Sequence, residues 1–146
     1  LLERKFSLEL LRHFTELRIA IEPGAAMLAA RTHDSEGLAV ISAGFARMVA
    51  ADAGDDDPLD ADIAFHVAIL EACGNPFYRQ FRDLVETALR TSIRFTNRFK
   101  GRTADLDQHR AVLEAIERHD SKAAGTSMAA LITDVQALIA AAEQEG

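Results

Sequence analysis

Cysteine, long apolar runs and positive charge are all scarce in this 146-residue sequence. The single cysteine, Cys73, excludes an intramolecular disulfide and a zinc ribbon, and it fits a reducing compartment. No uninterrupted apolar run approaches the roughly 20 residues that a membrane-spanning helix needs, and the charged residues Glu3, Arg4 and Lys5 are unlike a signal peptide. We therefore expect a cytoplasmic protein without a membrane segment.

Basic residues are outnumbered by acidic ones: 16 lysines and arginines stand against 23 aspartates and glutamates, which gives a formal net charge of −7. Because binding to phosphates depends mainly on Lys and Arg, this composition argues against the chain gripping nucleic acid by itself. The length and an apolar content of 49% suit one domain with one core. We expect residues 1–146 to form a single domain, and any DNA contact to come from elsewhere.

The sequence pattern is helical throughout. Apolar residues repeat with helical spacing, and no stretch alternates with a period of two for long enough to predict a strand. Capping residues and prolines mark where helices begin. Helices are predicted over residues 7–31, 35–51, 58–73, 76–98, 104–119 and from 121 nearly to the C-terminus, with caps at Asp34, Asp57, Asn75, Thr103 and Asp120. Six helices with short connections imply an all-α, largely antiparallel bundle.

Three polar residues, Asp62, His66 and His109, stand on helix stripes that are otherwise apolar. Asp62 and His66 are four residues apart and share one helix face. His109 lies between Leu106 and Leu113 in the helical repeat of apolar residues that is expected to face the core. Buried ionisable groups are unfavourable unless they are paired or coordinated. One carboxylate and two imidazoles from two helices suit Zn, Ni, Mn or Fe, so the pattern indicates a candidate metal site.

A simpler alternative is that each histidine is a core residue satisfied by one hydrogen bond. The spacing itself discriminates poorly, because an acid also stands four residues before His13, near the exposed start of the first helix. The helix face that each histidine occupies is the more informative property, and it favours His66 and His109.

Three further residues are candidates for binding a small molecule. Arg18 lies in register with the apolar stripe of the first helix, where it either pairs with Glu22 or faces a cavity and holds a carboxylate in a two-pronged hydrogen bond. Thr91 and Arg98 follow one face of the helix predicted over 76–98 and are candidate polar points on the cavity wall. An arginine near a helix C-terminus is also expected from the helix dipole.

Three sequence motifs, in this order and spacing, carry a resemblance to a known family. They are ELRIAIEP (16–23) with Ala29-Ala30, DIAFH (62–66) with Asn75-Pro76, and HRAVLEAI (109–116) with Asp120. The chain resembles the C-terminal effector-binding (FCD) domain of GntR-family transcription regulators of the FadR type. The resemblance implies a bundle of six or seven helices around a cavity, in which a divalent metal and a small organic acid bind side by side.

The resemblance assigns roles residue by residue. Asp62, His66 and His109 correspond to metal ligands, and Arg18 to the arginine that faces the effector. It also implies a separate N-terminal winged helix-turn-helix domain, which binds operator DNA as a dimer. The chain departs from the family pattern at one ligand, because Leu131 stands where members usually carry a further histidine, three residues after Met128.

Loss of that ligand leaves one carboxylate and two imidazoles, which can hold a metal such as Zn, Ni or Mn with positions open for water or an effector. Metal affinity should then be lower, and effector binding without metal is a second possibility. A similar loss of the last histidine occurs in regulators of this type that respond to sugar acids such as galactonate. The resemblance therefore implies a sugar acid as a candidate effector, and an aldonate could chelate through its carboxylate and 2-hydroxyl.

Two functions of other classes compete with a sensor domain. A metal-dependent hydrolase would use the same ligand set, but no glutamate adjoins either histidine as a general base. A dimerisation module without ligand would use the polar core residues only to fix register. We expect a regulator and not an enzyme.

Overall fold

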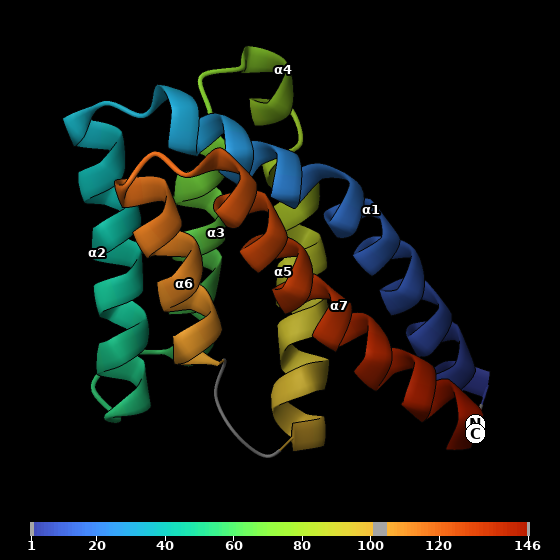
Figure 1. The fold of residues 1–146 in the computed structure, drawn as a ribbon. Helices are drawn as coiled ribbons and strands as arrows, with labels where there is room; N and C mark the ends of the chain where they lie inside the picture. Colours follow the sequence, from blue (N-terminus) through green and yellow to red (C-terminus); the bar gives the residue numbers. More distant parts are fainter. Residues whose placement is uncertain (1, 101–104, 146) are drawn as a thin grey trace.

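The computed structural model describes the backbone of residues 2–100 and 105–145 and the side chains of residues 7–91 and 105–145. Within these ranges the chain forms seven helices and no strand (Figure 1). The helices are α1 (Leu2–Thr32), α2 (Ser35–Asp52), α3 (Pro58–Ala72), α4 (Pro76–Arg79), α5 (Arg82–Lys100), α6 (Leu106–Glu117) and α7 (Ser121–Glu145). The all-α fold expected from the sequence is confirmed.

Most helices begin where the sequence predicts. Side-chain oxygens of Asp34, Asp57, Asn75 and Asp120 each accept a hydrogen bond from a backbone N–H of the first helical turn, at 2.7 to 3.0 Å. These bonds satisfy N–H groups that have no partner inside the helix. The prediction that Thr103 caps the next helix was wrong. Asp105 caps α6, because its side chain accepts a hydrogen bond from the Gln108 N–H. Residue 103 lies outside the described residues.

Two further differences from the prediction concern the first helix and the helix predicted over 76–98. The first helix begins at Leu2 and not near Ser7. The long helix predicted over 76–98 is two helices, because the chain turns between Arg79 and Arg82. At the turn the N–H groups of Gln80 and Phe81 donate to carbonyls three residues back, at 3.2 and 3.1 Å, so the backbone tightens before α5 begins. No glycine or proline marks this break.

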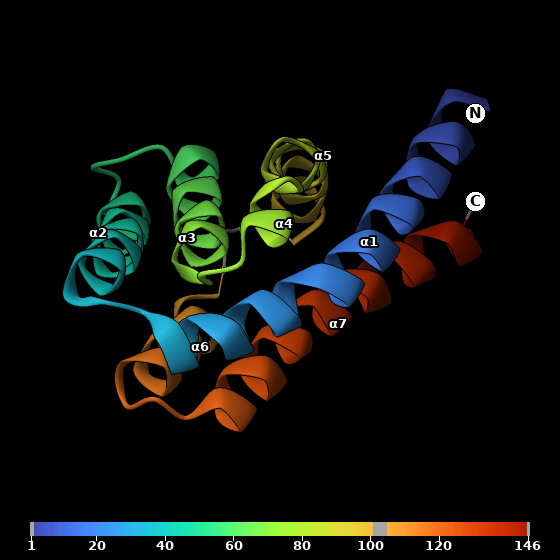
Figure 2. The same ribbon diagram turned by 90° about the horizontal axis from the view of Figure 1, so that it is seen from above.

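The longest helices, α1 and α7, lie side by side and antiparallel, so the two ends of the chain are close together (Figures 1 and 2). α2 packs on α3, and α6 packs on α7. The main core fills the space between these pairs, and a smaller apolar cluster around Leu8, Leu11 and Ile139 holds the ends of α1 and α7. By length and composition alone α7 could cross a membrane; in the structure it packs against α1, α5 and α6.

The contact between α2 and α3 is close enough to need a glycine. A Cβ atom at Gly44 would lie 2.9 Å from Cα of Phe65, a separation that real Cβ atoms do not reach. Gly44 is buried, and Phe65 and Ile41 are fully buried beside it. The small residue therefore lets α2 press on the segment of α3 that carries Asp62 and His66.

Candidate metal centre

Two helices bring the predicted ligands together. Asp62 and His66 lie one turn apart on α3, and His109 lies in the first turn of α6. All three side chains are buried, with exposed fractions of 4%, 3% and 4%. Neighbouring Phe65 presents an edge-to-face contact to both imidazole rings, with ring centroids 5.5 and 5.3 Å away. The three polar side chains are thus enclosed in the apolar core.

Their potential ligand atoms form a nearly regular triangle. Oδ1 of Asp62 is 3.1 Å from Nε2 of His66 and 3.1 Å from Nε2 of His109, and the two Nε2 atoms are 3.3 Å apart. Three ligand atoms that each lie about 2.1 Å from one ion are about 3.0 to 3.4 Å from one another when the angles at the ion are between octahedral and tetrahedral. The three side chains therefore suit a divalent transition metal, both in the distances between their ligand atoms and in the types of ligand that they offer.

The far nitrogen of each ring is held from outside this triangle. Nδ1 of His109 lies 2.6 Å from the backbone carbonyl of Asp105, the N-cap of its own helix. Nδ1 of His66 lies 2.6 Å from Oε1 of Glu22 on α1, an ion-pair contact that does not meet the geometry of a hydrogen bond. An oxygen at Nδ1 favours the proton on that nitrogen, which leaves Nε2 facing Asp62.

Glu22 joins this group to Arg18. Oε2 of Glu22 accepts a hydrogen bond of 2.7 Å from Nε of Arg18, one turn earlier on α1. Burial raises the pKa of Glu22, but Arg18 and His66 outweigh it and hold the pKa at about 2. The carboxylate is therefore charged and is shared between an arginine and a histidine.

Electrostatics keep Asp62 ionised and His66 protonated. Burial raises the pKa of Asp62, but His109 and His66 outweigh burial and hold the pKa well below its usual value. Burial lowers the pKa of His66, yet Glu22 and Asp62 outweigh it and raise the pKa to about 9. A proton on His66 thus balances the buried carboxylates in the protein without metal, and a bound metal would have to displace it.

The other candidate residues lie in different situations. Arg18 is buried, 3% exposed, and pairs with Glu22, which was one of the two alternatives for this residue. The pair places Arg18 one side chain away from His66. Thr91 is partly buried on α5 and donates to the Thr87 carbonyl of the same helix at 2.9 Å. The side chain of Arg98 lies outside the described residues. Leu131 is buried in the main core, 7% exposed.

Sequence reasoning missed Glu22 as part of this centre, since it considered the residue only as a partner of Arg18. The contact with His66 joins residues 44 positions apart and cannot be derived from local spacing. One feature of the sequence does indicate that Glu22 faces the core: it is four residues from Arg18, which lies on an apolar stripe of the same helix.

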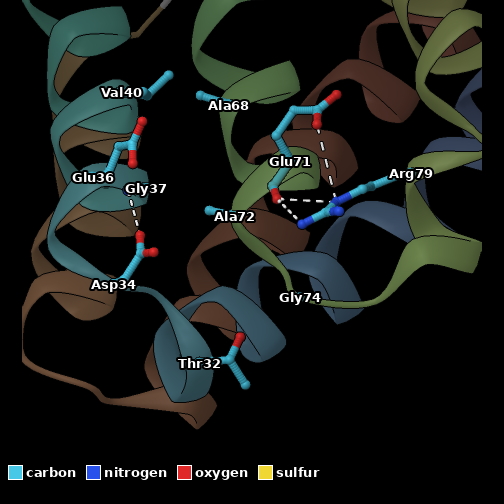
Figure 3. A pocket seen from close by; sticks show the side chains of 10 residues that line it. All are labelled: Thr32, Asp34, Glu36, Gly37, Val40, Ala68, Glu71, Ala72, Gly74 and Arg79. Carbon is cyan, nitrogen blue, oxygen red and sulfur yellow. Dashed lines mark hydrogen bonds and ion pairs between the residues drawn. The ribbon is translucent and has the colours of Figure 1, made fainter.

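A separate groove of about 380 Å³ lies where α1 ends and α2 begins, against the end of α3 (Figure 3). None of Asp62, His66 and His109 lines it. Its polar groups bind one another: Arg79 donates to the Glu71 carbonyl at 3.1 Å, and Asp34 caps α2. The groove is thus not the centre predicted from the sequence.

Comparison with known proteins identifies the fold and its family. Residues 13–134 match the FCD domain. The chain belongs to the FCD domain family. A solved structure, Streptococcus agalactiae GntR, superposes on this FCD domain with a TM-score of 0.74, covering 90% of this chain and 60% of that one at 23% sequence identity. At that identity the likeness shows the fold.

Two curated relatives from Escherichia coli (strain K12) match most of the FCD domain. The uncharacterized HTH-type transcriptional regulator YieP is 31% identical over 126 residues, or 85% of this chain and 54% of the relative. The galactonate operon transcriptional repressor is 29% identical over 127 residues, or 84% of this chain and 55% of the relative. This chain therefore spans about half the length of these relatives.

The comparisons confirm the resemblance to GntR-family transcription regulators. They also support a non-enzymatic protein, because the relatives are regulators, so the hydrolase alternative is not favoured.

Proposed function

We propose that this FCD domain is the ligand-sensing part of a transcription regulator, and that it binds a small organic acid next to a divalent metal held by Asp62, His66 and His109. The observation that carries the proposal is the buried triangle of ligand atoms, 3.1 to 3.3 Å on each side. When bound, the metal would supply a positive charge and open coordination positions for oxygen atoms of the acid.

The metal would be Zn, Ni or Mn. Imidazole ligands suit the first two, and the carboxylate also suits Mn. Since Leu131 offers no ligand atom, the protein contributes three ligands, and affinity should be lower than in a four-ligand site. The open positions would be taken by water or by the effector.

The acid would be recognised by Arg18, whose guanidinium suits a carboxylate. Thr91 and Arg98 are proposed as further polar contacts on the cavity wall. Similarity to the galactonate operon transcriptional repressor supports a sugar acid as the class of effector. A sugar acid also offers a hydroxyl beside its carboxylate, and the two together can chelate a metal.

The regulator as a whole would act on operator DNA. Residues 1–146 would be its effector domain, joined to an N-terminal winged helix-turn-helix domain, and the protein would work as a dimer in the cytoplasm. The acid can shift DNA affinity only if it binds two arrangements of the dimer with different affinity. A dimerisation module without ligand is the competing function.

Calorimetry tests the proposal. The purified domain is stripped with EDTA and titrated with Zn²⁺, and the zinc-loaded domain is then titrated with galactonate and other aldonates. Asp62→Ala should abolish zinc binding, and Arg18→Ala should weaken acid binding at least tenfold. Arg12→Ala is the matched control, because Arg12 lies on the same helix in exposed ion pairs with Glu16 and Glu143.

The outcomes separate the candidates. Absence of zinc binding by the wild type contradicts the metal site, and equal acid binding by wild type and Arg18→Ala contradicts the role of Arg18. A domain that binds neither zinc nor any acid but forms a stable dimer supports the dimerisation module.

A further inference from the structure

Glu22 is a buried carboxylate that connects two helices through two different partners. It is 2% exposed and lies on α1, whereas the three candidate ligands lie on α3 and α6. One oxygen faces Nδ1 of His66 at 2.6 Å, and the other accepts from Nε of Arg18 at 2.7 Å. The two contacts bring Arg18 and the ligand triangle to either side of one carboxylate.

The two histidines of the centre are oriented in different ways. His109 is held at Nδ1 by the backbone carbonyl of Asp105 in its own helix, so its orientation follows from the start of α6. Nδ1 of His66 instead faces the Glu22 side chain at ion-pair distance, the one contact that the described residues make with that atom. Its ring orientation therefore depends on where α1 places one carboxylate.

We propose that Glu22 is the positioning residue of the metal centre: it fixes the proton of His66 on Nδ1 and directs Nε2 toward the metal. The inference rests on the proposed function, because it concerns the same metal site. It also implies that Arg18 is linked to the metal through two side chains, Glu22 and then His66. An outer partner of this kind typically changes metal affinity 10- to 100-fold when it is removed.

Replacement by glutamine removes the arrangement while keeping the size of the side chain. If the amide oxygen accepts from Nδ1 of His66, the amide NH₂ faces the Nε–H of Arg18, and two donors oppose each other. If the amide is turned over, NH₂ faces Nδ1–H of His66 instead. Neither orientation satisfies both neighbours, so Glu22→Gln should release the His66 ring.

The experiment measures zinc affinity and ring protonation together. Zinc affinity of the wild type, Glu22→Gln and Glu22→Asp is measured by competition with a chromophoric chelator, with Glu16→Gln as the control because Glu16 is exposed on the same helix. Glu22→Asp keeps a buried charge opposite Arg18 but is too short to keep both contacts, so it covers the case in which the glutamine variant does not fold. Nitrogen-15 NMR of the zinc-loaded proteins reports the Nδ1–H of each histidine.

We expect zinc affinity to fall about 10- to 100-fold in the two Glu22 variants and to stay unchanged in Glu16→Gln. The Nδ1–H signal of His66 should disappear, and that of His109, which lies 2.6 Å from a backbone carbonyl, should remain. If a folded Glu22 variant binds zinc as tightly as the wild type does, the inference is overturned but the metal site is not. Equal loss of the Nδ1–H signals of His66 and His109 would have the same consequence. A wild type that binds no zinc would overturn the metal site, and the inference with it.

Discussion

Raising the pH should destabilise the metal-free domain through His66. Although burial lowers the pKa of this ring, Glu22 and Asp62 raise it to about 9 in the folded protein, against an ordinary value of about 6.5 in the unfolded chain. A pKa that is higher in the folded state contributes stability that is full below about 6.5 and is lost as the pH rises through about 9.

The size of the loss follows from the shift. A difference of roughly 2.5 pKa units corresponds to about 3 kcal/mol of unfolding free energy between pH 6 and pH 9.5. Glu22 does not add to this change, because its pKa is lowered to about 2, so its contribution is present above about 4.5 and is lost only in acid. The domain without metal should therefore be most stable near pH 5 to 6.

Urea unfolding in the presence of EDTA, at pH 6 and at pH 9.5, measures this loss. His66→Gln should be less stable than the wild type at pH 6 but should show little further loss at pH 9.5, because the titrating group is gone. His13→Gln is the control, since His13 is exposed. An unfolding free energy that does not fall in the wild type, or that falls equally in His66→Gln, would refute the reasoning.

Three further substitutions test the packing, the caps and the fourth ligand position. Gly44→Ala should cost about 1 to 3 kcal/mol of unfolding free energy in urea, because its Cβ would lie 2.9 Å from the backbone of Phe65. Asp57→Ala should cost about 1 kcal/mol in the same assay by removing the cap on the Leu59 N–H. Leu131→His should tighten zinc binding about tenfold or more in chelator competition; unchanged affinity would contradict the assigned ligand position.

The candidate metal ligands could be predicted from the sequence because they are polar residues at positions where helical periodicity predicts burial. His109 interrupts an apolar stripe, and Asp62 and His66 share a helix face, so helical periodicity was enough to predict that they face the core. Their exposed fractions of 3 to 4% agree with that prediction. Capping chemistry was equally local, which is why the starts of α2, α3 and α7 could be predicted from Asp34, Asp57 and Asp120.

The features that could not be predicted depend on tertiary contacts. The turn between α4 and α5 has no breaking residue, and its backbone stays close to helical geometry at Gln80. Next to it, Tyr78 packs on the core and its hydroxyl is 2.8 Å from where a Cβ of Gly24 would be. Packing against α1 thus accompanies a break that local propensity does not encode. The contact of Glu22 with His66 is of the same kind.

Charge balance predicts the order in which the proposed ligands bind. Without metal, the two positive charges of Arg18 and protonated His66 balance the two negative charges of Glu22 and Asp62. A divalent metal that displaces the His66 proton leaves one positive charge in excess, and a carboxylate from the effector would neutralise it. A carboxylate without metal would instead add an uncompensated negative charge in a buried place, which is unfavourable. Effector binding should therefore require the metal, even though Leu131 removes one ligand.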